Sequence, residues 1–559
     1  MKLYQYKSKT FKFLIPIIFI VTPFHASSQC LLVENIVGYT PTAKDRSMLE
    51  FSWLKIIDGK VVSTGQKIRP EVPPNCSTLD GKGQFVLPGL IDAHGHVSGL
   101  GNELMRVILR GTKSENEAVE RVIEFEKQNP QAKWILGRGW NQVLWPDKSF
   151  PSKSSLDKTN IDKPILLRRI DGHAAWANSK ALELAGINLQ TPDPEGGKIL
   201  RDEKGEATGV LIDNAMNLVE SKIPALSRIE QNYAFDKAFT HLLSQGITSA
   251  HDAGVSAMDY EIYKARSQSK EMPMRVYGML SGASPDLYQW LKQGVFQDSD
   301  DKVCVRSVKL YSDGALGSRG AAMLSPYSDD PDNKGLLVTT PEMLDSQVEA
   351  VLKAGFQVNV HAIGDKGNRN VLSAFEKAYK KVGGKQLRNR IEHAQVVALE
   401  DIPKFKSLDL IASMQPVHAT SDMNMAEDRI GQERLKGAYA WQKFIQQGTI
   451  IASGSDFPVE LANPFHGLHA AVTRQNHKNE PTEGWLPHEK MTPQQALRSF
   501  TLDAAFAAHQ ENKLGSLEPG KWADFILVDR DIIKGNPQEI WKTKVLATWV
   551  AGEKVYELK

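Results

Sequence analysis

The stretch GLIDAHGHVS (residues 89–98) places two histidines, His94 and His96, one residue apart behind an apolar run. On a β-strand, residues i and i+2 point to the same side, so both imidazoles would face one cavity and could bind one metal ion. A His-x-His pair alone is equally compatible with the polar end of a buried strand. The metal interpretation therefore needs further ligands elsewhere in the chain.

Four later segments supply such ligands. They carry Lys309 in VKLYSDG, His361 in NVHAIGD, His393 in IEHAQ and Asp456 in GSDFP. Taken alone, each has an ordinary explanation as a paired lysine, a satisfied core histidine or a loop cap. Together, imidazoles and a carboxylate are typical ligands of zinc and similar divalent ions. Three or four protein ligands would leave a position for water or substrate.

The segments that hold these residues follow a repeated pattern, in which a short apolar strand ends in a polar residue and a helical stretch follows. Eight segments fit it: QFVLPGLIDAHGH, GITSAHDAG, MRVYGML, CVRSVKLYSDG, FQVNVHAIGD, NRIEHAQ, LIASMQP and GTIIASGSDFP. Eight such units predict an α/β fold with a closed (β/α)8 TIM barrel in residues 86–510. Catalytic groups would then collect at the C-terminal ends of the strands.

Both ends of the chain have strand patterns of another kind. Residues 29–85 alternate apolar stretches with Asp-Gly and Thr-Gly turns, and residues 511–559 contain ADFILVDRD and VLATWVAGEKVYEL. We predict that the two ends form one small β-sandwich. The stretch of about 100–240 is too long for a barrel connection and predicts an inserted α+β subdomain that overhangs the active-site face.

The first 28 residues predict a signal peptide. Four lysines precede the apolar run FLIPIIFIV, and HASSQ offers small residues for cleavage, which we expect after Ser28. The run is too short for a transmembrane anchor, so the mature protein would be exported to the periplasm or secreted. Lipid attachment at Cys30 is a minor alternative. With Cys76 and Cys304 far apart in sequence, the cysteines do not predict a disulfide framework.

The overall charge argues for small-molecule chemistry. The 559 residues have a formal net charge of +2 and ordinary hydrophobic (41%) and charged (24%) fractions, which provide no basic surface for nucleic acid. We therefore expect a small-molecule substrate and no nucleic-acid partner.

Nine stretches resemble the amidohydrolase superfamily, and within it the YtcJ-like group that includes N-substituted formamide deformylases. They are LPGLIDAHGH, DGHAAWANSKAL, GITSAHDAG, VKLYSDGALGSRGA, VHAIGDKGN, RIEHAQ, MQPVHATSD, SGSDFPV and GSLEPGKWADFILVD. They occur in the family's order over nearly all of the chain after the signal segment.

The resemblance implies one or two divalent ions, zinc or another metal. The first ion would be bound by His94 and His96, and the second by His361 and His393. Asp456 would contact the first ion and also transfer protons.

Lys309 matches a position where superfamily members often carry a carbamylated lysine that bridges two ions. A buried lysine among cations loses its proton readily, and the neutral amine can take up carbon dioxide. A single ion beside an unmodified Lys309 stays open as an alternative.

Further residues are candidates for positions near the substrate. His173 in DGHAAW resembles a catalytic group on the oxyanion side. The expected substrate contacts are Trp140, Asp313, Arg319, Gln415 and His418. Trp140 would wall an apolar pocket, while the other four resemble family positions and could equally stabilise their loops.

The implied reaction is hydrolysis of an amide-type or formamide-type carbon–nitrogen bond other than a peptide bond. A metal-bound hydroxide would attack, with Asp456 as the proton shuttle. Two alternatives stay open: an esterase, carbamate or phosphoester hydrolase on the same metal site, and a metal-binding protein without turnover. A homodimer is also expected as one option for the assembly.

Overall fold

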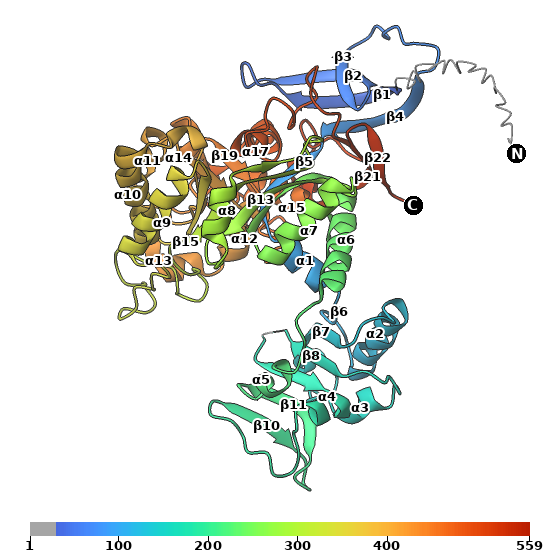
Figure 1. Cartoon of the computed structure of the whole chain (residues 1–559), viewed down its shortest axis with the longest axis vertical. Coiled ribbons are helices and arrows are strands. Elements are labelled where there is room, and N and C mark those ends of the chain that lie inside the picture. Colours follow the sequence, from blue (N-terminus) through green and yellow to red (C-terminus); the bar gives the residue numbers. More distant parts are fainter. Residues whose placement is uncertain (1–28, 171) are drawn as a thin grey trace, which may run out of the picture.

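The computed structural model describes residues 29–170 and 172–559, so the predicted signal segment lies outside the described part (Figure 1). Three β-sheets organise the chain. One is the barrel, one unites the two ends of the chain, and one belongs to the stretch inserted after the first barrel strand. In the described residues, no helix combines the length and the apolar character needed to cross a membrane.

The central sheet contains eight parallel strands in one path. Their bounds are β5 (Leu90–Gly95), β12 (Ile247–Val255), β13 (Arg275–Ser281), β15 (Val303–Tyr311), β16 (Gln357–Ala362), β17 (Arg390–His393), β18 (Ile411–Met414) and β19 (Ile451–Ser453). Each strand pairs with its successor in this order, and a parallel bridge between Gly95 and Phe457 brings the first and last strands together. All eight predicted segments carry these strands, which confirms the predicted α/β barrel.

Helices follow the barrel strands as in a (β/α)8 fold. They are α6 (Arg228–Ser244), α7 (Ala257–Gln268), α8 (Leu287–Gln293), α9 (Pro341–Lys353), α10 (Asp365–Val382), α11 (Ile402–Ser407), α12 (Pro416–Asp422), α13 (Ala426–Leu435), α14 (Trp441–Gln446), α15 (Pro464–Thr473), α16 (Pro493–Ser499) and α17 (Leu502–Ala507). α10 shows why they form: Val371, Leu372 and Phe375 share one buried face at helical spacing. α10 ends at Val382, and the next residue, Gly383, caps the helix with a φ of 71° that suits glycine.

The two ends of the chain meet in one seven-stranded sheet, ordered β22-β21-β20-β4-β1-β2-β3. The bounds are β1 (Cys30–Pro41), β2 (Met48–Ile57), β3 (Lys60–Gly65), β4 (Ser77–Pro88), β20 (Phe525–Val528), β21 (Val545–Val550) and β22 (Glu553–Glu557). Strand β4 from the N-terminal part pairs antiparallel with β20 from the C-terminal part. The ends therefore share one β-rich unit, in which hydrogen bonds join all strands into a single sheet.

The inserted stretch has its own six-stranded mixed sheet, ordered β10-β11-β9-β8-β7-β6. Its elements are β6 (Val107–Ile108), α2 (Glu115–Gln128), β7 (Ile135–Trp140), α3 (Lys153–Asp157), β8 (Ile165–Arg169), β9 (Ala174–Ala177), α4 (Ser179–Leu184), β10 (Gly197–Arg201), β11 (Ala207–Asp213) and α5 (Met216–Glu220). In Figure 1 it lies below the barrel, next to α6 and to α1 (Val97–Leu104). We call it the inserted subdomain.

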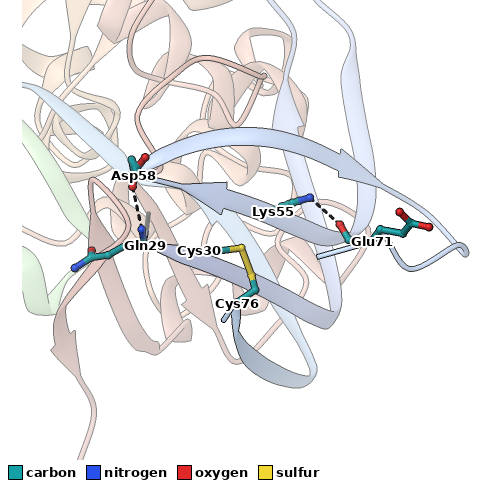
Figure 2. The surroundings of a disulfide bond; sticks show 6 residues. All are labelled: Gln29, Cys30, Lys55, Asp58, Glu71 and Cys76. Atoms are coloured by element: carbon teal, nitrogen blue, oxygen red, sulfur yellow. Dashed lines mark hydrogen bonds between the residues drawn. A yellow bond between two sulfur atoms is a disulfide. The ribbon is translucent and has the colours of Figure 1, made fainter. Parts of the chain in front are cut away.

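A disulfide joins Cys30 and Cys76 (Figure 2). Cys30 begins β1 and Cys76 directly precedes β4; these strands are parallel neighbours, with Leu31 opposite Ser77. The expectation of no disulfide was therefore wrong for this pair, because strand pairing brings together cysteines that are 46 residues apart in sequence. Cys304 is a buried free thiol.

Candidate metal centre

The C-terminal ends of the barrel strands surround one cavity of about 350 Å³. Its wall includes all six predicted metal-site residues: His94, His96, Lys309, His361, His393 and Asp456. They come from β5, β15, β16, β17 and the loops that follow β5 and β19. The barrel thus gathers side chains that are up to 362 positions apart in the sequence, at the strand ends where catalytic groups of this fold lie.

Two sets of three side chains could each hold a metal ion. His94, His96 and Asp456 form one set, and His393, His418 and Asp456 form the other, with donor atoms within 4.8 Å of one another in each set. The Asp456 Oδ1 atom lies 3.1 Å from His96 Nε2 and 3.7 Å from His94 Nε2. Imidazole nitrogens and a carboxylate oxygen are donors that zinc and similar ions accept, so the residues fit a divalent cation.

Buried partners orient the histidines with Nε2 toward the cavity. His94 Nδ1 donates to Glu392 Oε2 at 2.5 Å, His96 Nδ1 donates to the Ala253 carbonyl at 2.7 Å, and His393 Nδ1 donates to Gln415 Oε1 at 2.8 Å. Such a bond fixes the tautomer and leaves the other ring nitrogen free for a metal.

Glu392 is the functional residue that the sequence analysis missed. Burial raises the pKa of this carboxyl, but His94, Arg390 and Lys309 more than offset that effect and lower it to about 2. Glu392 is therefore ionised and accepts the hydrogen bond from the Nδ1–H group of His94. The sequence signal was the acidic residue in RIEHAQ, directly before His393 in a short strand segment.

Asp92 fixes the loop that carries Asp456. Its carboxylate accepts hydrogen bonds from both the backbone N–H and the hydroxyl of Ser455, the latter at 2.6 Å. The Asp456 N–H donates to the His94 carbonyl at 2.7 Å. A Cβ at Gly454 would lie 2.5 Å from the His94 nitrogen, so this close approach requires glycine.

The Lys309 ammonium group is buried against His94, with its Nζ atom 3.1 Å from His94 Nε2. Burial lowers the pKa of Lys309, against the opposing effect of the Glu392 and Asp456 carboxylates. A lowered pKa increases the neutral fraction that carbamylation needs.

His361 also lines the cavity, but its Nε2 faces the loop after β15. That atom lies 3.3 Å from the Gly314 carbonyl and 3.8 Å from Asp313 Oδ1. Burial lowers the pKa of His361 to about 3, helped by the Lys309 charge. The ring is therefore neutral, and it belongs to neither set of three donors.

Three of the expected substrate contacts are paired with other groups of the protein. Asp313 accepts backbone hydrogen bonds from Ala322, Ile363 and Gly364. The Arg319 side chain pairs with Asp329, away from the cavity wall. Gln415 lies behind His393, as described above. Their polar groups are occupied within the protein, which is the loop-stabilising alternative that the sequence left open for these three residues.

His418 is the expected contact that does line the cavity. Its Nε2 lies 3.8 Å from Asp456 Oδ2.

The inserted subdomain does not reach the cavity: among the described residues that line it, none comes from this unit. Trp140 is fully buried in the subdomain's own core, where its indole N–H donates to the Leu167 carbonyl at 2.6 Å. His173 is 77% exposed, with its ring 2.8 Å from Asp213. The expected overhang, the substrate contact of Trp140 and the catalytic position of His173 are therefore not seen. The subdomain packs its own core beside the barrel.

A parallel eight-stranded barrel with imidazoles and a carboxylate at its strand ends defines the class of metal-dependent barrel hydrolases. The model of the Amidohydrolase family matches residues 77–556, and this chain belongs to that family. The protein is therefore a metal-dependent hydrolase of the amidohydrolase superfamily, as the sequence motifs predicted.

Curated relatives span nearly the whole chain. Protein LONG AFTER FAR-RED 3 of Arabidopsis thaliana is 34% identical over 94% of this chain and 91% of its own length. The putative amidohydrolase YtcJ of Bacillus subtilis is 30% identical over 89% and 95%. The N-substituted formamide deformylase of Arthrobacter pascens is 27% identical over 89% and 93%.

A solved structure has the same fold. It is an uncharacterized metal-dependent hydrolase from Pyrococcus furiosus, 30% identical, with a TM-score of 0.74 over 90% of this chain and all of that chain.

Proposed function

We propose that this protein hydrolyses an amide-type carbon–nitrogen bond, other than a peptide bond, in a small molecule. The observation that carries the proposal is the convergence of two imidazole and carboxylate donor sets on one cavity. The relative that is an N-substituted formamide deformylase supports this type of bond. The donor set favours zinc as the cation.

The chain's own residues would help such a reaction in two ways, by holding a cation and by moving a proton. When bound, a divalent cation would supply an activated water at neutral pH and would polarise the substrate carbonyl. His94, His96 and Asp456 would hold that cation. Asp456 also accepts the proton of the attacking water and delivers it to the leaving nitrogen. Its carboxylate lies at the cavity wall, within reach of a bound substrate.

The rest of the cavity indicates what the substrate looks like. Leu316, Ile363 and Val459 share its wall with the histidines. A polar centre beside apolar side chains suits a carbonyl compound that carries an apolar substituent. We therefore propose an N-substituted amide or formamide with a hydrophobic group on nitrogen.

A substrate panel tests the proposal. Zinc-loaded protein would be incubated with N-substituted formamides, N-acyl amines, aryl esters and phosphoesters, and the amine, alcohol or phosphate released would be quantified. We expect amine release that disappears in the His94→Ala/His96→Ala variant. Turnover of esters or phosphoesters alone would overturn the bond assignment, and no turnover of any compound would favour a binding protein.

We also propose that the protein is exported. The predicted signal segment and the Cys30–Cys76 disulfide support this, because disulfides persist in oxidising compartments. A sulfur atom bonded to Cys76 cannot carry a lipid, so the disulfide argues against lipid attachment at Cys30. Mass spectrometry of the purified native protein without reductant tests both points. An N-terminus at Met1 would contradict export, whereas a lipid on Cys30 would contradict only the argument against lipid attachment.

A further inference from the structure

A second cavity lies at the junction between the barrel and the inserted subdomain (Figure 1). Its volume is about 310 Å³, and it shares no described lining residue with the metal cavity. The walls come from α1 and α6 on the barrel side, from α2 to β7 in the subdomain, and from the two segments that connect these units. This volume is at the lower end of the range for small-molecule sites, so the cavity has room for a compact organic molecule.

Apolar side chains form much of the wall. Phe125, Trp134 and Leu136 line the cavity from the inserted subdomain, and Met105 and Leu226 line it from the connecting segments. All five are only half-buried. A flat apolar group placed against them would remove more of their surface from water and could stack on the two aromatic rings. The cavity therefore suits a molecule with an apolar ring.

The charged groups of the wall do not balance. Among its described lining residues, the charged ones are Arg106, Lys133 and Glu230. Lys133 Nζ lies 3.3 Å from Glu230 Oε1, so these two charges compensate each other. Within residues 29–170 and 172–559, the Arg106 side chain forms no hydrogen bond or ion pair. The wall thus has one uncompensated positive charge.

The surroundings of Arg106 favour an anion at this position. Partial burial and the charge of Arg168 lower the pKa of Arg106, and the Glu103 carboxylate offsets this only in part. A guanidinium group stays protonated in proteins, so a nearby anion would stabilise its charge. The guanidinium fork matches a carboxylate, which it binds through two parallel hydrogen bonds.

Asn102 on α1 provides a second polar contact in the same wall. Its Oδ1 atom is buried and has no hydrogen-bond partner in the described part of the chain. A buried polar atom of a native protein normally finds a partner. The hydroxyl or N–H group of a ligand would be a suitable donor, four residues along the chain from Arg106.

We propose that this junction cavity binds a small organic acid that has an apolar ring, a carboxylate for Arg106 and a hydroxyl or N–H donor for Asn102. The inference goes beyond the proposed function, because the cavity lies outside the metal centre and takes no part in hydrolysis. Since both units contribute to its walls, a bound acid also holds the inserted subdomain against the barrel.

Three related compounds test the chemistry of the ligand. Phenyllactate has a ring, a carboxylate and a hydroxyl group, but no amide bond to hydrolyse. Phenylpropionate lacks the hydroxyl group, and phenylpropanediol has an alcohol in place of the carboxylate. Each compound would be titrated into the purified protein by calorimetry. We expect phenyllactate to bind more tightly than phenylpropionate, and phenylpropanediol not to bind.

Four variants locate the site. Arg106→Gln removes the charge, and Ala132→Trp puts a large ring at a half-buried alanine of the cavity wall. Arg110→Gln is the matched control, because Arg110 is an exposed arginine of the same subdomain outside the cavity lining. His94→Ala/His96→Ala removes the metal site. Circular dichroism would confirm that each variant is folded.

Arg106→Gln should bind phenyllactate at least about tenfold more weakly, the effect of losing a charged hydrogen-bond partner, and Ala132→Trp should not bind it. Arg110→Gln and His94→Ala/His96→Ala should keep the parental affinity. No binding by the parent protein, parental affinity in either cavity variant, or loss of binding in the metal-site variant would overturn the proposal. Binding of the diol as tight as that of phenyllactate would refute a site for acids.

These measurements record binding and not turnover, so they are independent of the proposed function. Hydrolysis by a protein that binds no phenyllactate would refute the junction site alone. Binding of phenyllactate by a protein that hydrolyses no substrate would refute the proposed function alone.

Discussion

The Nδ1 atom of His94 lies 2.5 Å from the Oε2 atom of Glu392, and neither side chain has any exposed surface. The two residues are 298 positions apart and come from β5 and β17, on different sides of the barrel. An ionised carboxylate can only accept a hydrogen bond, so the His94 proton must be on Nδ1. The pair therefore keeps Nε2 unprotonated and aimed into the cavity.

We predict that Glu392→Gln weakens metal binding while the protein stays folded. The glutamine amide oxygen can still accept the hydrogen bond from His94 Nδ1–H. It lacks the negative charge that strengthens this hydrogen bond and increases the basicity of the imidazole. Loss of such a partner typically costs about 10–100-fold in metal affinity. Competition with a chromophoric chelator would measure this loss.

Glu376→Gln is the matched control, because Glu376 lies on the surface of α10 and pairs with Lys380. Its metal affinity should equal that of the parent protein. If Glu392→Gln also bound metal with parental affinity, the positioning role of Glu392 would be refuted.

The barrel was predictable because parallel strands buried on both faces appear in the sequence as short continuous apolar runs. In β19, Ile451 and Ala452 are buried and continue an apolar run that ends at Ser453, directly before the loop that carries Asp456. The same argument located His94, Lys309 and His393. Strand ends of a barrel converge in space, so residues at these ends could be grouped from the sequence alone.

The partners behind the metal-site residues were not predictable in the same way. Glu392 reaches His94 from β17, and Gln415 lies directly after β18. No local sequence pattern specifies the relative register of these strands. The disulfide depends on β1 pairing with β4 in one register. Trp140 could be recognised as apolar, but only the fold shows that the inserted subdomain buries it in its own core.

We predict that the disulfide stabilises the seven-stranded sheet. Replacing both cysteines in Cys30→Ala/Cys76→Ala removes a cross-link that spans 46 residues, which should cost about 2–4 kcal/mol. Thermal unfolding would show a lower midpoint than in the oxidised parent. Reductant should lower the midpoint of the parent and leave the double variant unchanged; equal midpoints for all samples would contradict the prediction.

Protonation of a buried histidine outside the metal centre should destabilise the fold in acid. His469 on α15 is fully buried, with its Nε2 atom 3.2 Å from Asn479 Oδ1. Burial lowers its pKa to about 4, although the hydrogen bond with Asn479 acts in the opposite direction. As the pH falls, His469 therefore becomes protonated at a higher pH in the unfolded chain than in the folded protein. Stability is complete above about pH 6.5 and declines toward pH 4, by at most about 1.4 kcal/mol per pH unit for this residue.

Denaturant unfolding between pH 7 and pH 4.5, with a chelator present to remove metal effects, would measure that decline. His469→Gln should show a shallower pH dependence than the parent protein, whatever its absolute stability. An exposed-histidine control, His488→Gln, should keep the parental slope. An unchanged slope in His469→Gln would assign the acid sensitivity to other groups.

The last prediction separates metal binding from proton transfer at Asp456. Asparagine preserves the shape of the side chain and one oxygen that can bind a cation, but it cannot accept a proton at ordinary pH. With zinc in excess, Asp456→Asn should keep bound metal while turnover falls by at least roughly a hundredfold, the effect expected when a general base is lost. Asp345→Asn, a surface substitution at a residue that pairs with Lys377, should retain parental turnover. Turnover and bound metal would be measured on the same samples, because a loss of both together would show only that Asp456 is a ligand. Parental turnover in metal-loaded Asp456→Asn would show that a different group carries the proton.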